Sequence, residues 1–231
     1  MMISCVIPTY KREDLLRRAV ESVLTQAVDG ADIEVIVVND AGESLQPAEW
    51  QSDPRVTLVN TQNVERCYAR NTGATMARGD YLHFLDDDDI ILPGCYQALL
   101  DTARKSDAGW VYGAYEEADD GGNPNRTVPP WPTGSVFAVA VAGLAIPMGA
   151  SLIKRDLFLK SGGFDPALWV SQDAELLQRL SVITHIECTE QVVSRFRVGV
   201  TPASTTSWEL AAECGRLQRE KAFSMPGAAG L

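Results

Sequence analysis

The chain has 231 residues, of which 45% are hydrophobic, and its 20 Lys and Arg against 31 Asp and Glu give a formal net charge of −11. This length and composition suffice for a real core in one α/β domain, whereas the negative charge excludes a general electrostatic hold on nucleic acid or an anionic membrane. An anionic ligand would therefore need a local cation.

The first half of the chain alternates strand-like and helix-like segments. The predicted strands cover residues 2–8, 33–39, 55–60 and 80–85. The predicted helices cover residues 12–27, 65–77 and 93–106, the last with Pro93 in its first turn. Because the strands are short, β-branched and nearly all apolar, we expect a parallel sheet covered by helices on both faces.

The second half starts with another expected strand within residues 108–118. Residues 119–135 are rich in Gly, Pro and Asn, which indicates a loop or hairpin with a functional or mobile role. Further elements are expected as a helix over 171–181, strand patterns over 184–198, a last helix near 206–223 and a flexible tail over 224–231. An apolar last helix could support a homodimer.

Cysteine usage and hydropathy indicate the cellular setting. The five cysteines are scattered, odd in number and without a C-x-x-C pair, and the two histidines have no zinc spacing, so we expect a reduced, cytoplasmic protein. No apolar stretch approaches the about 18 residues of a membrane helix, and the apolar start lacks a basic n-region. We therefore expect neither a transmembrane segment nor a signal peptide.

Polar residues follow each predicted strand of the first half, where parallel sheets bind their ligands. They are Thr9 and Tyr10, Asn39 and Asp40, Asn60 to Asn63, and Asp86 to Asp89. Neighbouring carboxylates about 5 Å apart repel by roughly 3 kcal/mol at an effective dielectric near 20, so the four aspartates need compensation. A divalent cation with its preference for oxygen ligands would supply it. The alternative is a solvated acidic turn ahead of the next helix.

Four segments, in this order and at these distances, resemble the inverting family 2 glycosyltransferases over about residues 2–198. They are CVIPTYKREDLLRRAVESVLTQ, IEVIVVNDAGES, NVERCYARNTGATMARGDYLHFLDDDD and SGGFDPALWVSQDAELLQRL. The resemblance implies a GT-A fold, which is Rossmann-like with a mostly parallel central sheet flanked by helices. A single domain over 1–223 would have a nucleotide-binding half at 1–106 and an acceptor-binding half at 107–205.

The resemblance also implies the donor site. It gives nucleotide-binding roles to Pro8, Thr9, Tyr10, Asp40, Arg70, Asp86 and Asp87. Asp86 and Asp88 take the positions that bind Mn²⁺ or Mg²⁺, with Asp86 also facing the ribose and Asp88 the more direct ligand. Asn39 stands where the family usually has the first of two acids, which favours Asp40 as the contact to the base.

The catalytic base is expected on the helix over 171–181. Ser171 is a suitable N-cap and would put Asp173 in the first turn, where the helix dipole favours its ionised form. The resemblance makes Asp173 the general base that deprotonates the acceptor hydroxyl, while Gln172 replaces a family Glu. An ordinary first-turn acid is the alternative for Asp173, and Arg179 is expected to be an orienting or structural partner.

Weaker features concern the leaving group and the acceptor. Arg197 lies in a segment, 194–205, that resembles the one closing over the pyrophosphate, and it is predicted to bind phosphate, with a solvent-facing arginine as the equal alternative. Gly199 replaces a family His, so the resemblance gives no metal ligand there. Trp131 would stack on a sugar or anchor its loop. By analogy the acceptor side is lined by Gly149, Ala150 and Ser151, and structural roles are expected for His83 and His185.

Together these features predict a metal-dependent, inverting glycosyltransferase. It would transfer a sugar from a UDP- or dTDP-sugar to a hydroxyl acceptor such as a saccharide or lipid-linked saccharide, in polysaccharide, glycolipid or glycoconjugate synthesis. A sugar nucleotidyltransferase would need glycine in the PTYKRED loop, and an aspartyl phosphohydrolase would need an acid at Thr9. A non-catalytic nucleotide- or carbohydrate-binding member of the fold remains an alternative because of Asn39, Gln172 and Gly199.

Overall fold

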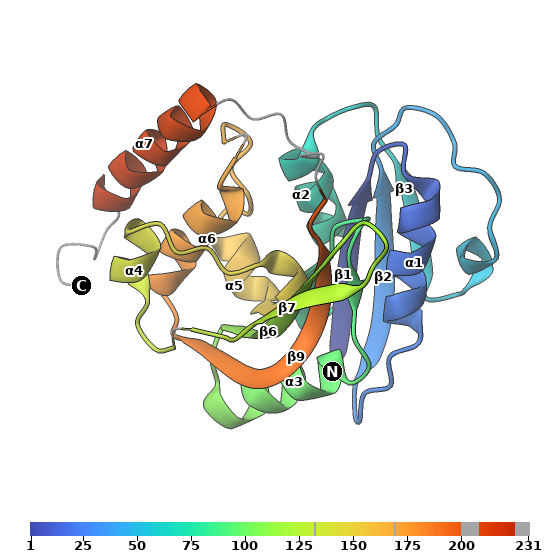
Figure 1. Cartoon of the computed structure of the whole chain (residues 1–231), viewed down its shortest axis with the longest axis horizontal. Coiled ribbons are helices and arrows are strands. Elements are labelled where there is room, and N and C mark those ends of the chain that lie inside the picture. Colours follow the sequence, from blue (N-terminus) through green and yellow to red (C-terminus); the bar gives the residue numbers. More distant parts are fainter. Residues whose placement is uncertain (132, 169, 200–207, 225–231) are drawn as a thin grey trace.

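The structure is a computed structural model that describes residues 1–131, 133–168, 170–199 and 208–224. Its centre is a nine-stranded sheet in the order β3-β2-β1-β4-β8-β6-β9-β5, with β7 paired to β6 (Figure 1). The strands are β1 Met2–Thr9, β2 Asp32–Asn39, β3 Val56–Asn60, β4 Tyr81–Phe84, β5 Ile90–Ile91, β6 Trp110–Ala118, β7 Pro124–Val128, β8 Ser151–Lys154 and β9 Ile186–Arg197.

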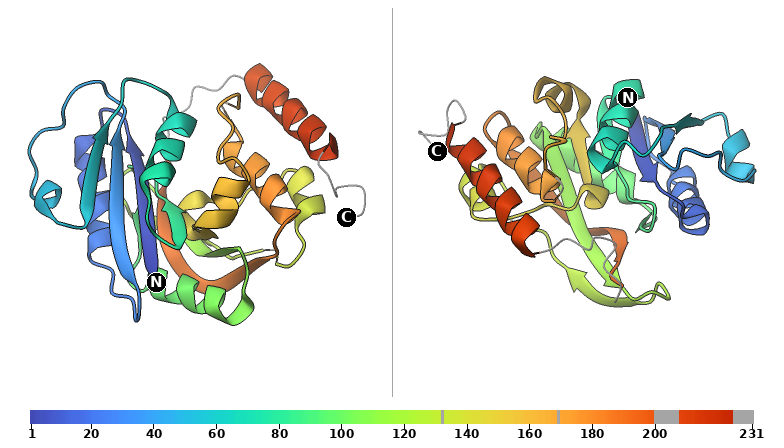
Figure 2. Two further views of the ribbon diagram at one scale, coloured as in Figure 1. Left: turned by 180° about the vertical axis from the view of Figure 1, so that it is seen from behind. Right: turned by 90° about the horizontal axis from the view of Figure 1, so that it is seen from above.

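Helices cover both faces of this sheet. They are α1 Glu13–Leu24, α2 Arg66–Met76, α3 Cys95–Ser106, α4 Phe137–Val141, α5 Arg155–Lys160, α6 Gln172–Ser181 and α7 Trp208–Ser224, with short 3₁₀ helices η1 Glu49–Ser52 and η2 Met148–Ala150. One hydrophobic cluster joins α1 and α3 to the sheet, and a second joins α2, α4, α5 and α6 to it. α7 contacts α4 and α6 at the end of the molecule away from α1 (Figures 1 and 2).

The first half of the sheet confirms the predicted parallel strands. β1 pairs in parallel with both β2 and β4, and β2 pairs in parallel with β3. The register places Thr9 beside Asn39 and Asn39 beside Asn60. The polar residues that follow these strands therefore meet at one edge of the sheet.

The second half adds antiparallel pairings. β8 lies antiparallel between β4 and β6. β7 folds back on β6, which confirms a hairpin within the predicted loop or hairpin segment 119–135. The strand patterns over 184–198 form one 12-residue strand, β9, which runs parallel to β6 and shifts register near Ala114. Figure 1 shows how strongly β9 curves around the sheet.

Element ends differ from the sequence prediction at several places. α3 begins at Cys95 and not at Pro93, because Gly94 has φ 81°, a left-handed conformation that cannot belong to the helix. α7 extends to Ser224, whereas residues 206, 207 and 225–231 of the predicted helix and tail lie outside the described residues. Among the described helices, none has the length and apolarity needed to cross a membrane.

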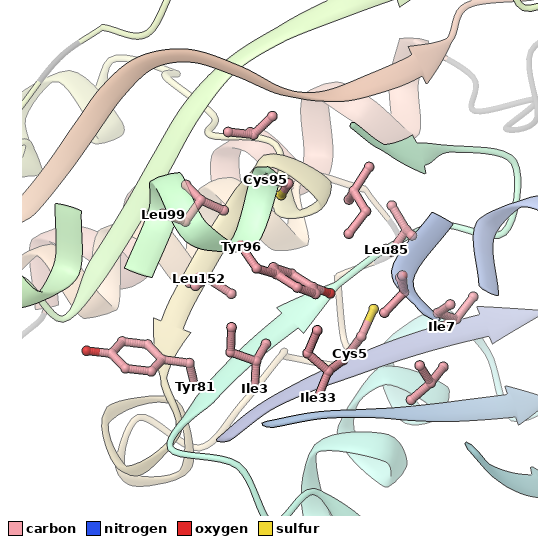
Figure 3. Packing of buried hydrophobic residues seen from close by; sticks show 14 of the residues in the cluster. Ile3, Cys5, Ile7, Ile33, Tyr81, Leu85, Cys95, Tyr96, Leu99 and Leu152 are labelled. Atoms are coloured by element: carbon pink, nitrogen blue, oxygen red, sulfur yellow. The ribbon is translucent and has the colours of Figure 1, made fainter. Parts of the chain in front are cut away.

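The core between β1, β4 and α3 contains a buried histidine. Figure 3 shows Cys5 and Ile7 packed with Tyr96 and Leu85 in this cluster. His83 donates from Nε2 to the Gly149 carbonyl at 3.1 Å, and its Nδ1 accepts from the Tyr96 hydroxyl at 2.8 Å. Burial lowers the pKa of His83 to about 4, so the ring is neutral at neutral pH. The prediction of a structural histidine is confirmed.

Candidate functional site

A cavity of about 560 Å³ lies where the strands of the first half end. Its lining residues are Pro8, Thr9, Tyr10, Arg12, Asp40, Asn63, Glu65, Arg66, Ala69, Asp86, Asp87, Asp88, Asp89, Phe196 and Arg197. We call this cavity the cleft. It brings together the predicted nucleotide, phosphate and metal residues except Arg70. The predicted base, Asp173, does not line it either.

Asp40 shapes one wall of the cleft. Its buried carboxylate accepts hydrogen bonds from Thr61 Oγ1 at 2.7 Å, from the Val64 amide at 2.8 Å and from the Glu65 amide at 3.1 Å. Both oxygens of Asp40 thus hold the loop between β3 and α2. The predicted contact of Asp40 with a base stays a prediction.

Asn39 explains why an amide stands at the end of β2. Its Nδ2 donates to Asn60 Oδ1 and to the Glu43 carbonyl, both at 2.7 Å, and its Oδ1 accepts from the Ala41 amide at 3.2 Å. A carboxylate could not donate to these two acceptors, so both hydrogen bonds would be lost. The departure from the family pattern therefore has a structural reason.

Asp87 faces β1 and the start of α1. Thr9 Oγ1 donates to its Oδ2 at 2.7 Å, and Arg12 Nη1 lies 3.2 Å from its Oδ1. Burial raises the pKa of Asp87 to about 6, although the Thr9 hydrogen bond and the Arg12 charge oppose this rise. Asp87 thus couples the ends of β1 and β4 and lines the cleft at the same time.

Arg70 lies beneath the cleft and is only 5% exposed. Its Nη2 donates to Asp86 Oδ1 at 2.5 Å, and its guanidinium carbon lies 5.3 Å from the Phe164 ring centroid. Its Nε has no hydrogen-bond partner among the described residues. Burial would raise the pKa of Asp86, but the charges of Arg70 and Arg66 outweigh it, so this pKa lies below its ordinary value.

Asp86 and Asp88 have the chemistry of a divalent-cation site. Each is bonded through one oxygen, Asp86 Oδ1 to Arg70 and Asp88 Oδ2 to Arg12, and within the described part of the chain the second oxygen of each has no hydrogen bond. Both line the cleft. The described residues contain no group of three or more His, Cys, Asp or Glu that could hold a metal ion alone. Two free carboxylate oxygens fit Mg²⁺ or Mn²⁺, which takes further ligands from water and phosphate.

Arg197 closes the other side of the cleft. Its amide donates to Asp89 Oδ1 at 2.9 Å, and its Nε lies 3.2 Å from Asp120 Oδ1, in the loop between β6 and β7. Burial raises the pKa of Asp89 well above its ordinary value. Arg197 lines the cleft, as a phosphate contact requires, but its guanidinium is already paired. Residues 200–205 of its segment lie outside the described residues.

Asp173 lies in the first turn of α6, as predicted. Ser171 is the N-cap residue with φ 61°, but its side chain makes no capping hydrogen bond. Asp173 Oδ1 accepts from the Ala174 amide at 2.9 Å. Burial raises the pKa of Asp173, and the charge of Arg70 opposes this rise. Asp173 does not line the cleft. The charge of Arg70 acts on both Asp86 and Asp173 and lowers the pKa of each.

Arg179 is a structural partner, which confirms its prediction. Its Nε and Nη2 donate to the Glu175 carboxylate at 2.7 and 2.6 Å. It also donates to the carbonyls of Ser161 and Gly163, both at 2.6 Å. These bonds fix α6 against the turn after α5 and thereby fix the helix that carries Asp173.

Gly149, Ala150 and Ser151, expected by analogy on the acceptor side, are buried. Their role toward an acceptor stays a prediction. A Cβ on Gly149 would lie 2.8 Å from Phe196 Cε1, so the small residue serves the packing of Phe196. Trp131 is 66% exposed, which excludes a packing anchor and leaves stacking on a sugar as a prediction.

Sequence reasoning missed three charged residues that line the cleft. Arg12 is the cation that balances Asp87 and Asp88, and its signal is a basic residue shortly after the first strand. Glu65 is the N-cap residue of α2 and Arg66 its first residue, and both follow the end of β3. Their signal is their place at a strand end, the same criterion that selected the aspartates.

Comparison with known proteins adds the family. The sequence profile described as glycosyl transferase family 2 matches residues 4–160. An uncharacterized glycosyltransferase of Haemophilus influenzae is 30% identical over 183 residues, which are 78% of this chain and 62% of the relative. The poly(ribitol-phosphate) beta-N-acetylglucosaminyltransferase TarP of Staphylococcus aureus is 27% identical over 118 residues, 49% of this chain and 36% of TarP.

The fold has solved counterparts. A crystal structure of S. aureus TarS in complex with UDP-GlcNAc has a TM-score of 0.75 at 17% identity and covers 94% of this chain and 65% of that chain. This likeness shows a shared fold. The chain spans less than two thirds of the length of each of these three proteins.

Proposed function

The chain belongs to glycosyl transferase family 2 and has the GT-A fold, and from this premise we propose that it is a metal-dependent, inverting glycosyltransferase. It transfers one sugar from a nucleoside-diphosphate sugar to a hydroxyl acceptor. The observation that carries the proposal is the convergence of strand-end residues of β1, β2 and β4 with Arg197 of β9 around one cleft. Family membership alone would not require these residues to meet.

The donor's nucleoside fits the wall made by Pro8, Thr9 and Tyr10. The Tyr10 side chain is 48% exposed and lines the cleft, so its ring can stack on a base. Asp40 holds the loop that forms the adjoining wall. The UDP-GlcNAc complex of TarS supports UDP-GlcNAc as the first donor to test.

Asp86 and Asp88 would hold Mn²⁺ or Mg²⁺ through their free oxygens. The bound ion would neutralise charge on the diphosphate as it becomes the leaving group. Arg197 is the second group on this side, and a guanidinium suits two phosphate oxygens. To use it, the diphosphate must displace the Asp120 carboxylate.

Asp173 is the proposed general base. Its carboxylate takes the proton of the acceptor hydroxyl while that oxygen forms a bond to the anomeric carbon. The bond from this carbon to the diphosphate oxygen breaks on the opposite face, and the nucleoside diphosphate leaves with the electron pair. Burial makes Asp173 a stronger base, and the charge of Arg70 favours the ionised carboxylate.

A non-catalytic role is less well supported than the sequence suggested. Asn39 is one of the three departures from the family pattern that favoured a non-catalytic role. The Asn39 amide has a structural role that an acid cannot fill. A nucleotidyltransferase predicts release of pyrophosphate, whereas the proposed reaction releases a free nucleoside diphosphate.

A thermal-shift screen followed by product analysis tests the proposal. We expect one nucleoside-diphosphate sugar, starting from UDP-GlcNAc and a dTDP-sugar, to raise the melting temperature only with Mn²⁺ or Mg²⁺. With a saccharide acceptor, the product should have the opposite anomeric configuration by NMR. Binding without turnover across a broad acceptor panel, or release of pyrophosphate, would contradict the proposal.

A further inference from the structure

The cations around the cleft are nearly all paired. Arg12 bonds to Asp87 and Asp88, Arg70 bonds to Asp86, and Arg197 bonds to Asp120. A diphosphate that approached any of these arginines would have to displace a carboxylate. In a chain of net charge −11, an unpaired cation in the cleft therefore has special value for an anionic ligand.

Arg66 is such a cation. It is exposed, it is the first residue of α2 and it lines the cleft. Its side chain makes no ion pair or hydrogen bond with any residue in the described ranges, and the cleft that it lines also contains Asp86 and Asp88. The guanidinium is thus in the same cleft as the proposed metal ligands and is free to bind.

The position of Arg66 is unfavourable for the helix itself. The first turn of an α-helix carries partial positive charge, which repels a cation and attracts an anion. The first turn of α2 has no acidic residue, and the N-cap residue Glu65 makes no side-chain capping hydrogen bond. An anion bound at the N-terminus of α2 would relieve this repulsion and bind Arg66 at the same time.

One helical turn further, α2 carries a second unused donor on a buried side chain. Arg70 is 5% exposed, and its Nε has no partner among the described residues although its Nη2 bonds to Asp86. Residues four apart share one face of a helix. Arg66 and Arg70 therefore lie on one face of α2, with Arg66 in the cleft and Arg70 beneath it.

We propose that Arg66 binds the diphosphate of the donor. This inference rests on the proposed function and deepens it, because it names the group that recognises the leaving phosphates before any carboxylate is displaced. Arg66 is neither the base nor a metal ligand. Its contribution is to donor affinity and depends on charge.

The test compares nucleoside diphosphates with nucleosides in calorimetric titrations with Mn²⁺. We expect Arg66→Gln to weaken binding of the best ligand among UDP, dTDP and GDP by about tenfold, the loss of one charge-assisted contact. Binding of the matching nucleoside should not change, because it lacks phosphate. Arg66→Lys should recover part of the loss. Added salt should weaken the parent more than Arg66→Gln.

Arg17→Gln provides the matched control. Arg17 is an exposed arginine of α1 that makes no ion pair or hydrogen bond with a described residue and does not line the cleft. Equal affinities of parent and Arg66→Gln for the diphosphate, or an equal loss for diphosphate and nucleoside, would overturn the inference alone. If the parent bound no nucleoside diphosphate, the proposed function would fall and the inference with it.

Discussion

Arg70 and Asp86 form an ion pair of 2.5 Å that joins α2 to the acidic turn after β4. Arg70 is almost completely buried, whereas the Asp86 side chain is 41% exposed. Replacing Arg70 by Met removes the charge that compensates Asp86 and keeps most of the apolar volume. We expect Arg70→Met to lower the free energy of unfolding, measured in urea titrations, by about 2–4 kcal/mol. This is somewhat less than the loss for a fully buried pair, because the Asp86 side chain is partly exposed.

Arg55→Met is the control for this prediction. Arg55 pairs with Asp53 at 2.8 Å, but its side chain is exposed, and such pairs contribute about 0–1 kcal/mol. A loss for Arg70→Met no larger than that for Arg55→Met would show that the pair under the cleft does not stabilise the fold.

Glu65 has φ 79° and ψ 156°, a conformation that is nearly exclusive to glycine. Two hydrogen bonds hold it there: the Glu65 amide donates to the Asp40 carboxylate, and the Glu65 carbonyl accepts from the Ala69 amide in the first turn of α2. Glycine at this position should relieve about 1–3 kcal/mol of backbone strain. It also loses more conformational entropy on folding, which costs about 0.5–1 kcal/mol. We therefore expect Glu65→Gly to be more stable than the parent by about 1 kcal/mol. Thermal unfolding would show this as a higher melting temperature.

Glu65→Ala separates strain from charge. Alanine removes the carboxylate but keeps the Cβ that causes the strain, so we expect no gain in melting temperature. A gain as large as that of Glu65→Gly would assign the effect to the repulsion among the cleft acids and not to the backbone.

Much of the donor side could be predicted from the sequence because strand ends are local signals. An apolar, β-branched run followed by polar residues places Thr9, Asp40 and Asp86 at one sheet edge once the strands are parallel. Register then brings them together, as the pairing of Thr9 with Asn39 shows.

What could not be predicted depends on contacts between distant segments. The Asp40 carboxylate bonds to amides after β3, and nothing local to Asp40 indicates this choice. Gly149 is small because Phe196 of β9 packs against it, so a small residue at this position does not by itself indicate room for a sugar. The pairing of Arg197 with Asp120 likewise requires the β6–β7 hairpin.

The buried His83 gives the protein a specific pH dependence. Its pKa is about 4 in the folded protein because of burial, against about 6.5 in the unfolded chain, so between these values the unfolded state binds the extra proton. This group therefore lowers stability as pH falls from about 6.5 to about 4, by about 3 kcal/mol or less, and has no further effect below that. Urea titrations across this range should show a shallower decline for His83→Gln than for the parent. Parallel declines would contradict the assignment.

Asp173→Asn tests the proposed base most directly. Asparagine keeps the shape and can still accept from the Ala174 amide, but it cannot take a proton from the acceptor hydroxyl. We expect the transfer rate to fall by about 10²–10⁴-fold while donor affinity, measured by titration, stays within about twofold, because Asp173 does not line the cleft. Asp156→Asn is the control, since Asp156 is an exposed acid in the first turn of α5 and should not affect transfer. Transfer by Asp173→Asn at the parental rate would show that another group removes the proton.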